Sequence, residues 1–337
     1  SQASLDILQL VSENYVFRNI EIFCTCSIGI ALAPQDGKDL DTLIKKADIA
    51  MYHSKDSGRN SFRFFNPAIN RNMLDHISLI SGMRKALQEK QFSLHYQPKI
   101  DLRTNQICGF EALLRWQHPE QGFISPAIFI PLAESSGLII QLGEWVIQEV
   151  CRQAKHWYDI GLLQFTIAIN ISSIQFKRGN IDNLVLGALA ASGLPPQYLE
   201  LELTESLLIE DSDRLVTTLS HLRSEGVHLS IDDFGTGYSN LGYLKKFEVE
   251  ALKIDQSFVR KMDDQSNDAA IVRAIIQMAN SLGLKTIAEG VEDAPTLALL
   301  RSLGCTQAQG FYWARPMPAD EVPIYCDMWE KNNAEAL

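Results

Sequence analysis

LELELTES (199–206) alternates leucine with polar residues and predicts a half-buried β-strand. The leucines at 199, 201 and 203 share one face, and Glu200 and Glu202 lie on the other. Glu205 follows where this strand should end. Which fold is predicted depends on whether the glutamate face meets solvent or the inside of a closed sheet.

Segments with strand patterns and segments with helical periodicity alternate from residue 92 to the end of the chain. The strand segments are 93–100, 109–116, 166–172, 199–204, 227–233, 251–255, 285–290 and 308–313. Helical periodicity is found, for example, over 129–161 and 266–284. This alternation predicts an α/β fold, a (β/α)₈ TIM-like barrel. The short link DLRTNQI (101–107) cannot hold a crossover helix, so we expect an antiparallel first strand.

The segment before the barrel is expected to be a partial α/β unit. IEIFCTCSIGIALA (20–33) and SFRFF (61–65) predict strands, with a helix from about residue 43 between them. Apolar residues at helical spacing then predict a connecting helix over 67–91. We therefore expect three parts: 1–66, 67–91 and a barrel over 92–335.

Strand parity places a polar residue near the C-terminal end of several barrel strands. Asn170, Glu202, Asp232 and Lys253 all fall on the faces opposite the apolar residues. If the apolar faces pack outward under helices, these polar side chains point inward. They meet at the C-terminal mouth, where barrel enzymes have their active sites.

The mouth is rich in oxygen ligands. The set is Glu111, Asn170, Glu202, Asp232, Asp233 and Glu289. Five carboxylates in one mouth would repel each other unless cations lay among them. An oxygen-only ligand set favours Mg²⁺ or Mn²⁺ over zinc. The adjacent aspartates suit two ions, which serve phosphoryl hydrolysis, and Lys253 would add positive charge near the transition state.

Composition excludes several classes of protein. A net charge of −11 argues against binding genomic nucleic acid. The six cysteines form no CxxC pair, so we expect reduced thiols and a cytoplasmic location, even where a longer parent protein is membrane-tethered. No apolar run reaches the roughly 18 residues of a membrane span.

FEALLRW (110–116) resembles the signature of EAL domains, the bacterial phosphodiesterases that open the second messenger cyclic di-GMP. The resemblance extends over about residues 80–335. Further matching motifs are YQPKI (96–100), FIPLAESSGLI (129–139), INISSIQF (169–176), ELTES (202–206), DDFGTGYSNL (232–241), LKIDQSFV (252–259), AEGVE (288–292) and QGFYWARPMP (309–318). The resemblance implies metal-dependent hydrolysis of cyclic di-GMP to the linear dinucleotide.

The resemblance also assigns roles to single residues. It implies one ion on Glu111, Asn170, Glu202 and Asp232, and a second on Asp232, Asp233 and Glu289. Lys253, Glu289 and Glu205 would be catalytic, with Lys253 beside the attacking water. Gln97, Arg115, Leu114, Gln309 and Pro318 would contact the substrate, and Glu205, Glu292 and Gln309 would support the site. We also expect a homodimer through this domain.

Residues 27–65 resemble the C-terminal half of a GGDEF domain, the diguanylate cyclase fold. The half with the Gly-Gly-Asp/Glu-Glu-Phe loop is not in this sequence. We therefore expect residues 1–66 to be an incomplete domain of a longer GGDEF–EAL protein, without cyclase activity of its own.

Two alternatives to the phosphodiesterase stay open: a non-catalytic cyclic di-GMP receptor and a barrel hydrolase for another phosphate ester. A third question concerns DFGTGYSN (233–240), whose glycines predict a turn. The turn is either an ordinary loop or a loop that must be ordered for the second ion. In the second case Glu205 would hold it, through Thr236, Ser239 or backbone N–H groups.

Overall fold

The computed structural model divides into two compact units, Ser1–Gly82 and Met83–Leu337, which are described separately. It describes residues 2–12, 15–17, 20–22, 24–56, 60–162, 164–178, 180–205, 207, 213–236, 244, 246–260, 262–263 and 265–334. Helix α3 (Pro67–Gln88) contains the division. The three-part division expected from the sequence stays a prediction.

The first unit is a small α/β segment. Its elements are α1 (Gln2–Val11), β1 (Tyr15–Phe17), β2 (Ile20–Ile22), β3 (Ile28–Ile30), α2 (Leu40–Asp56), β4 (Phe62–Phe64) and the start of α3. Strands β1 and β2 pair antiparallel, and β3 pairs parallel to β4. The run 20–33 was expected as one strand and instead forms β2 and β3. It divides because β2 pairs with β1, whereas Ile28 begins a separate pairing with Phe62.

The second unit is built on a closed barrel of eight strands. They are β5 (Phe92–Asp101), β6 (Ile107–His118), β8 (Thr166–Ile171), β9 (Leu199–Thr204), β10 (His228–Phe234), β11 (Ala251–Ile254), β12 (Lys285–Ala288) and β13 (Gln307–Gln309). The strands lie in chain order, and β5 closes the circle by pairing with both β13 and β6. Strand β5 is antiparallel to both neighbours, while the other pairs around the barrel are parallel. The predicted TIM-like barrel with an antiparallel first strand is confirmed.

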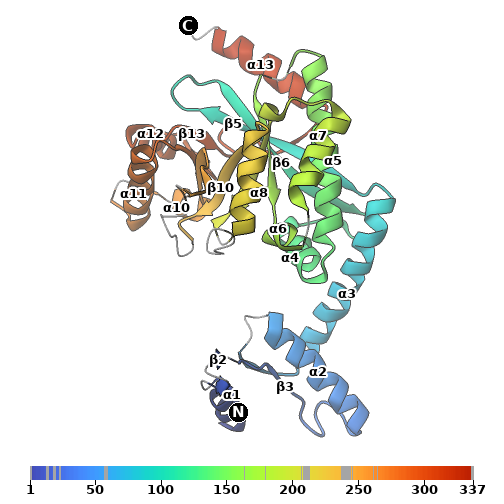
Figure 1. Ribbon diagram of the computed structural model, residues 1–337. Coiled ribbons are helices and arrows are strands. Elements are labelled where there is room, and N and C mark those ends of the chain that lie inside the picture. Colours follow the sequence, from blue (N-terminus) through green and yellow to red (C-terminus); the bar gives the residue numbers. More distant parts are fainter. Residues whose placement is uncertain are drawn as a thin grey trace. The chain divides into compact units, whose positions relative to one another are not determined.

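Helices surround the barrel (Figure 1). They are α4 (Pro126–Ser136), α5 (Ile139–Asp159), α6 (Ser173–Arg178), α7 (Ile181–Ser192), α8 (Asp213–Ser224), α10 (Gln256–Val259), α11 (Asn267–Ser281), α12 (Ala294–Ser302) and α13 (Val322–Ala334). A 3₁₀ turn (Pro196–Tyr198) and two short strands, β7 (Gly122–Ile124) and β14 (Met317–Pro318), complete the unit.

The packed core lies between the strands and these helices. Leu199, Leu201 and Leu203 of β9 are fully buried in the same apolar cluster as Val150 and Ala154 of α5. The leucines of the alternating stretch therefore point outward into the core, and Glu200 and Glu202 point into the barrel. Both glutamates are also buried.

The helical segment predicted over 129–161 is two helices, α4 and α5, with a 120° bend between them. The break falls at Gly137, whose φ of 78° ends α4 in the left-handed conformation that glycine adopts readily. Within the described residues, no single helix is long and apolar enough to span a membrane; of the helix pairs, only α4 with α5 reaches that length and composition, across the bend.

Strand β13 is shorter than the 308–313 predicted from the sequence, because the chain turns at Gly310. Val291 N–H donates to the Gln309 carbonyl at 3.1 Å, and Tyr312 N–H donates to the Val291 carbonyl at 2.9 Å. A Cβ at position 310 would lie 2.0 Å from the Val291 oxygen. Glycine therefore lets this turn dock against the segment after β12, which brings Gln309 close to the mouth.

Gly310→Ala should destabilise the barrel by about 2 kcal/mol or more, because backbone atoms must shift to admit the methyl group. The measurement is urea unfolding. Gly187→Ala is the matched control: Gly187 lies in helix α7 with open space around its Cβ position, so alanine should stabilise there by about 0.5–1 kcal/mol. Equal unfolding midpoints for the two variants would contradict the packing role of Gly310.

Candidate active site

Adjacent aspartates reach the mouth because strand β10 contains a bulge. Ile231 pairs with Leu252 and Phe234 pairs with Ile254, so two residues of β10 lie opposite the single Lys253 of β11. Asp233 has a φ of 55°, which is uncommon for a residue other than glycine. Strict alternation would have turned Asp233 away from Asp232. The bulge instead brings oxygens of Asp232, Asp233 and Glu289 within 4.8 Å of one another.

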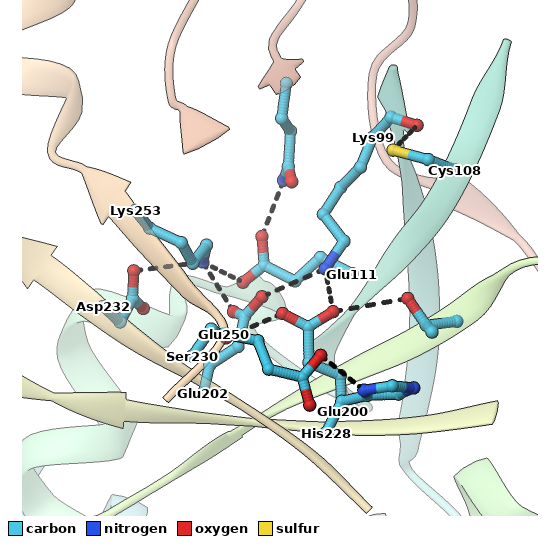
Figure 2. A network of polar contacts seen from close by, with 12 residues as sticks. Lys99, Cys108, Glu111, Glu200, Glu202, His228, Ser230, Asp232, Glu250 and Lys253 are labelled. Carbon is cyan, nitrogen blue, oxygen red and sulfur yellow. Dashed lines mark hydrogen bonds and ion pairs between the residues drawn. The ribbon is translucent and has the colours of Figure 1, made fainter. Parts of the chain in front are cut away.

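Lys253 lies at the centre of the carboxylates and is fully buried. Its Nζ is 2.5 Å from Glu202 Oε2 and 2.6 Å from Glu289 Oε1. Asp232 Oδ1 follows at 3.0 Å and Glu111 Oε1 at 3.6 Å. Figure 2 shows Lys253 with Glu111, Glu202 and Asp232 around it. Five of the seven predicted catalytic and metal residues that carry charge thus meet at one point.

Glu111 of β6 is held by amide groups from strands β8 and β13. Asn170 Nδ2 donates to its Oε1 at 2.6 Å, and Gln309 Nε2 donates to its Oε2 at 2.6 Å. Gln309 Nε2 also donates to Gln97 Oε1 at 2.9 Å. Asn170 therefore lies where the sequence predicted, but presents its nitrogen to Glu111. As a metal ligand it would have to present its amide oxygen instead.

Burial and mutual repulsion shift the carboxylates in different directions. Burial raises the pKa of Glu202 well above its usual value despite the nearby Lys253, and Glu111 and Asp232 add repulsion. Burial also opposes ionisation of Glu111, but Lys253 and the two amide donors outweigh it and lower its pKa. The pKa of Lys253 is raised, because the carboxylates, Asp232 first, outweigh its burial.

Two of the carboxyl groups expected to hold the second ion also have raised pKa values. Burial, followed by repulsion from Asp232 and Asp255, raises the pKa of Asp233 to about 6. Burial is also the largest cause that raises the pKa of Glu289, with Asp232 and Glu111 adding to it. Both carboxyl groups are therefore protonated more readily than exposed ones, chiefly because burial disfavours their charged form.

The residues fit divalent cations by charge and by ligand chemistry. Five carboxylates face one Lys253 ammonium, and the surplus of four negative charges matches two divalent ions. Glu202 Oε1 is buried and has no hydrogen-bond partner among the residues that the structure describes. A buried oxygen without a donor suits a hard cation.

Glu205 contacts the loop after β10. Its Oε2 accepts a hydrogen bond from Gly235 N–H at 2.9 Å, and Glu205 is buried. The contact expected from the sequence is therefore present, and it uses a backbone N–H group. Thr236 instead donates its hydroxyl hydrogen to the Asp233 carbonyl at 2.8 Å. Residues 237–240 of this loop, including Ser239, lie outside the described residues.

Two cavities are lined in part by the carboxylates. The first, of about 280 Å³, is lined by residues that include Gln97, Glu111, Glu289, Glu292 and Gln309. The second, of about 250 Å³, is mostly apolar and includes Leu114 and Asp233. Arg115 and Asp232 line both. Pro318, which was expected to contact the substrate, lies in β14 and pairs with His95 of β5. The proline that lines the first cavity is Pro316.

Sequence reasoning missed a polar layer deeper in the barrel. Lys99 and Glu200 are both buried, with Lys99 Nζ 2.6 Å from Glu200 Oε2. Their signal was strand parity, since Lys99 shares a face with Gln97 and Glu200 shares one with Glu202. Arg260, which pairs with Glu292 at 3.1 Å and lines the first cavity, was also missed and had no such signal.

The chain belongs to the EAL domain family: residues 81–316 match the family described as "EAL domain". Residues 2–61 match the family described as "Diguanylate cyclase, GGDEF domain". Both resemblances seen in the sequence are confirmed.

Two curated relatives are similar to this chain over most of its length. The bifunctional diguanylate cyclase/cyclic di-GMP phosphodiesterase MucR of Pseudomonas aeruginosa is 45% identical over 316 residues, covering 94% of this chain and 46% of MucR. The cyclic di-GMP phosphodiesterase PdeR of Escherichia coli is 42% identical over 300 residues, covering 89% of this chain and 45% of PdeR. The chain thus spans about half the length of these relatives.

Solved structures agree with the fold. The PaMucR phosphodiesterase in complex with c-di-GMP has a TM-score of 0.70 and 46% identity, covering 73% of this chain and 99% of that one. The EAL domain of FimX from Pseudomonas aeruginosa, bound to c-di-GMP, has a TM-score of 0.65 and 27% identity, covering 71% of this chain and 96% of that one.

Metal affinity should rise with pH through about 6. Asp233 has a raised pKa, so it is protonated below about pH 6, and an ion must displace that proton. Between pH 5 and pH 7 the affinity for Mn²⁺ should increase about tenfold. Calorimetry at several pH values measures it. Asp233→Asn should reduce the dependence between pH 5 and pH 7, with the proton on Glu289 accounting for what remains. An unchanged slope in that variant would contradict the assignment.

Proposed function

We propose that this chain hydrolyses cyclic di-GMP to the linear dinucleotide, using two Mg²⁺ or Mn²⁺ ions held by the carboxylates of the barrel mouth. The observation that carries the proposal is the ring of carboxylates around Lys253 at a barrel mouth. The relatives MucR and PdeR, which are named as phosphodiesterases of this substrate, support it. The roles of the single residues remain part of the proposal.

The cavities suit a ligand with a phosphate at its centre and a flat ring at each end. Arg115 is half-buried where the two cavities meet, and its planar guanidinium matches a phosphate group. The second cavity offers apolar side chains such as Leu114 to the face of a purine. The first offers the amides of Gln97 and Gln309.

Bound divalent ions would supply an activated water and positive charge against the phosphate oxygens. The chain itself contributes orientation and charge. Lys253 carries a fixed ammonium beside the carboxylates, so it can neutralise charge that develops in the transition state. Gln309 keeps Glu111 turned into the mouth, and Glu205 holds the backbone that carries Asp233.

The cellular setting is also part of the proposal. All six cysteines are free thiols, which supports the cytoplasmic location expected from the sequence. A homodimer, and a longer parent protein with a complete GGDEF domain, stay predictions.

Glu111→Ala should abolish most turnover while leaving the barrel folded. The variant loses one of the proposed metal ligands at the mouth, so the rate should fall at least about a hundredfold. The unfolding midpoint should stay within about 5 °C, because Glu111 lies outside the apolar core between the strands and the helices. Chromatography of cyclic di-GMP and its linear product, with Mg²⁺ and after chelation, measures the rate.

Glu144→Ala is the control, because Glu144 is exposed on α5 and lines neither cavity. Full turnover in Glu111→Ala would refute the metal assignment. Binding of cyclic di-GMP without any turnover by the unaltered chain would make it a receptor instead.

Glu205→Ala should reduce turnover more than substrate binding. The variant loses a charge-assisted hydrogen bond to Gly235 N–H, so the segment with Asp233 is held less firmly. We expect kcat to fall about tenfold or more and KM to change by about twofold or less. Glu205→Gln keeps an acceptor oxygen and should lose less. A KM effect that equals the kcat effect in Glu205→Ala would show a substrate-binding role.

A further inference from the structure

A second polar layer lies beneath the carboxylates, inside the barrel. Lys99 of β5 and Glu200 of β9 form its ion pair at 2.6 Å. Ser230 Oγ donates to Glu200 Oε1 at 2.7 Å, and Thr166 Oγ1 donates to Glu200 Oε2 at 3.3 Å. Four strands therefore contribute to one network (Figure 2). The proposed mechanism does not use any of these side chains.

The position of Lys99 is the informative feature. Its Nζ lies 3.6 Å from Glu202 Oε1, the buried oxygen without a hydrogen-bond partner among the described residues. An ammonium in a dry interior normally bonds to every carboxylate within reach. Lys99 makes its short contact, 2.6 Å, with Glu200, which is itself fixed by hydroxyl groups from two other strands, and only the longer ion pair with Glu202.

We propose that Glu200 is a positioning residue of the metal site, because it keeps the Lys99 ammonium 3.6 Å from Glu202 Oε1, beyond hydrogen-bond distance, and so leaves that oxygen able to bind a divalent cation. The inference rests on the two-ion site proposed above. Without Glu200, Lys99 would move to Glu202, which already accepts from Lys253 at 2.5 Å. Two ammonium groups on one carboxylate would then compete with the ion.

The alternative explanation is that the Lys99–Glu200 ion pair only stabilises the fold. In that case any substitution of Lys99 or Glu200 would change stability and leave metal affinity alone. The two explanations are separated by a double substitution, since removing Lys99 as well removes the competing ammonium.

The test is calorimetric titration of the metal-free protein with Mn²⁺ alone. Glu200→Gln keeps the size of the side chain and removes its charge. It should weaken Mn²⁺ binding about tenfold, equivalent to about 1.4 kcal/mol. The double variant Lys99→Met/Glu200→Gln should bind Mn²⁺ within about twofold of the unaltered protein. Phosphodiesterase activity of Glu200→Gln should recover at high Mn²⁺, because weaker binding is overcome by concentration.

Glu250→Gln is the matched control. Glu250 precedes β11 at the opposite end of the barrel and pairs with His228 at 2.7 Å, so this variant should bind Mn²⁺ normally. If Glu200→Gln does not fold, Ser230→Ala replaces it. This variant loosens Glu200 without changing charge and should weaken Mn²⁺ binding by a few-fold.

Each outcome decides the matter. Unchanged affinity in Glu200→Gln, or a double variant as weak as the single one, would overturn the positioning role and leave the proposed function intact. If the unaltered protein binds no Mn²⁺, the proposed function and this inference both fail. Weak binding in Glu200→Gln with recovery in the double variant supports the inference.

Discussion

A closed barrel leaves little room for water at its centre, so each charge inside it needs an opposite charge within a few ångströms. This constraint organises the whole site. Lys253 satisfies it for the upper carboxylates, and Lys99 satisfies it for Glu200 below them. The upper layer has more carboxylates than one ammonium can balance. The imbalance sits where solvent and substrate can enter, which is where divalent ions can complete the charge.

Much of this arrangement follows from the alternation of apolar and polar residues along the strands. The strict alternation of leucine and glutamate in β9 requires two environments, and a closed sheet under helices provides an apolar one outside and a polar one inside. The short link after β5 required an antiparallel neighbour. Asn170, Glu202, Asp232 and Lys253 follow from the same parity, since the faces of parallel strands in register align around the barrel.

Other features depend on local geometry that the pattern does not contain. The bulge in β10 breaks the alternation at Asp232–Asp233, and it became visible only through the register with β11. Gly137 divides a segment with continuous apolar periodicity. The sequence does not predict this break, because a glycine inside such a run can either continue the helix or end it. The partner of Lys99 also depends on distance: Glu200 and Glu202 lie on the same face, and only the structure shows which one it bonds.

The antiparallel first strand has a further consequence. In a barrel with parallel strands alone, the incoming chain would arrive at the end remote from the active site. Here Phe92, the first residue of β5, pairs with Trp116 near the C-terminal end of β6. The chain therefore enters at the catalytic rim, and β5 then runs down past Gln97, which lies opposite Glu111. The strand by which the chain enters the barrel therefore also supplies Gln97 to the wall of the first cavity, so a change in the position of β5 would change that wall directly.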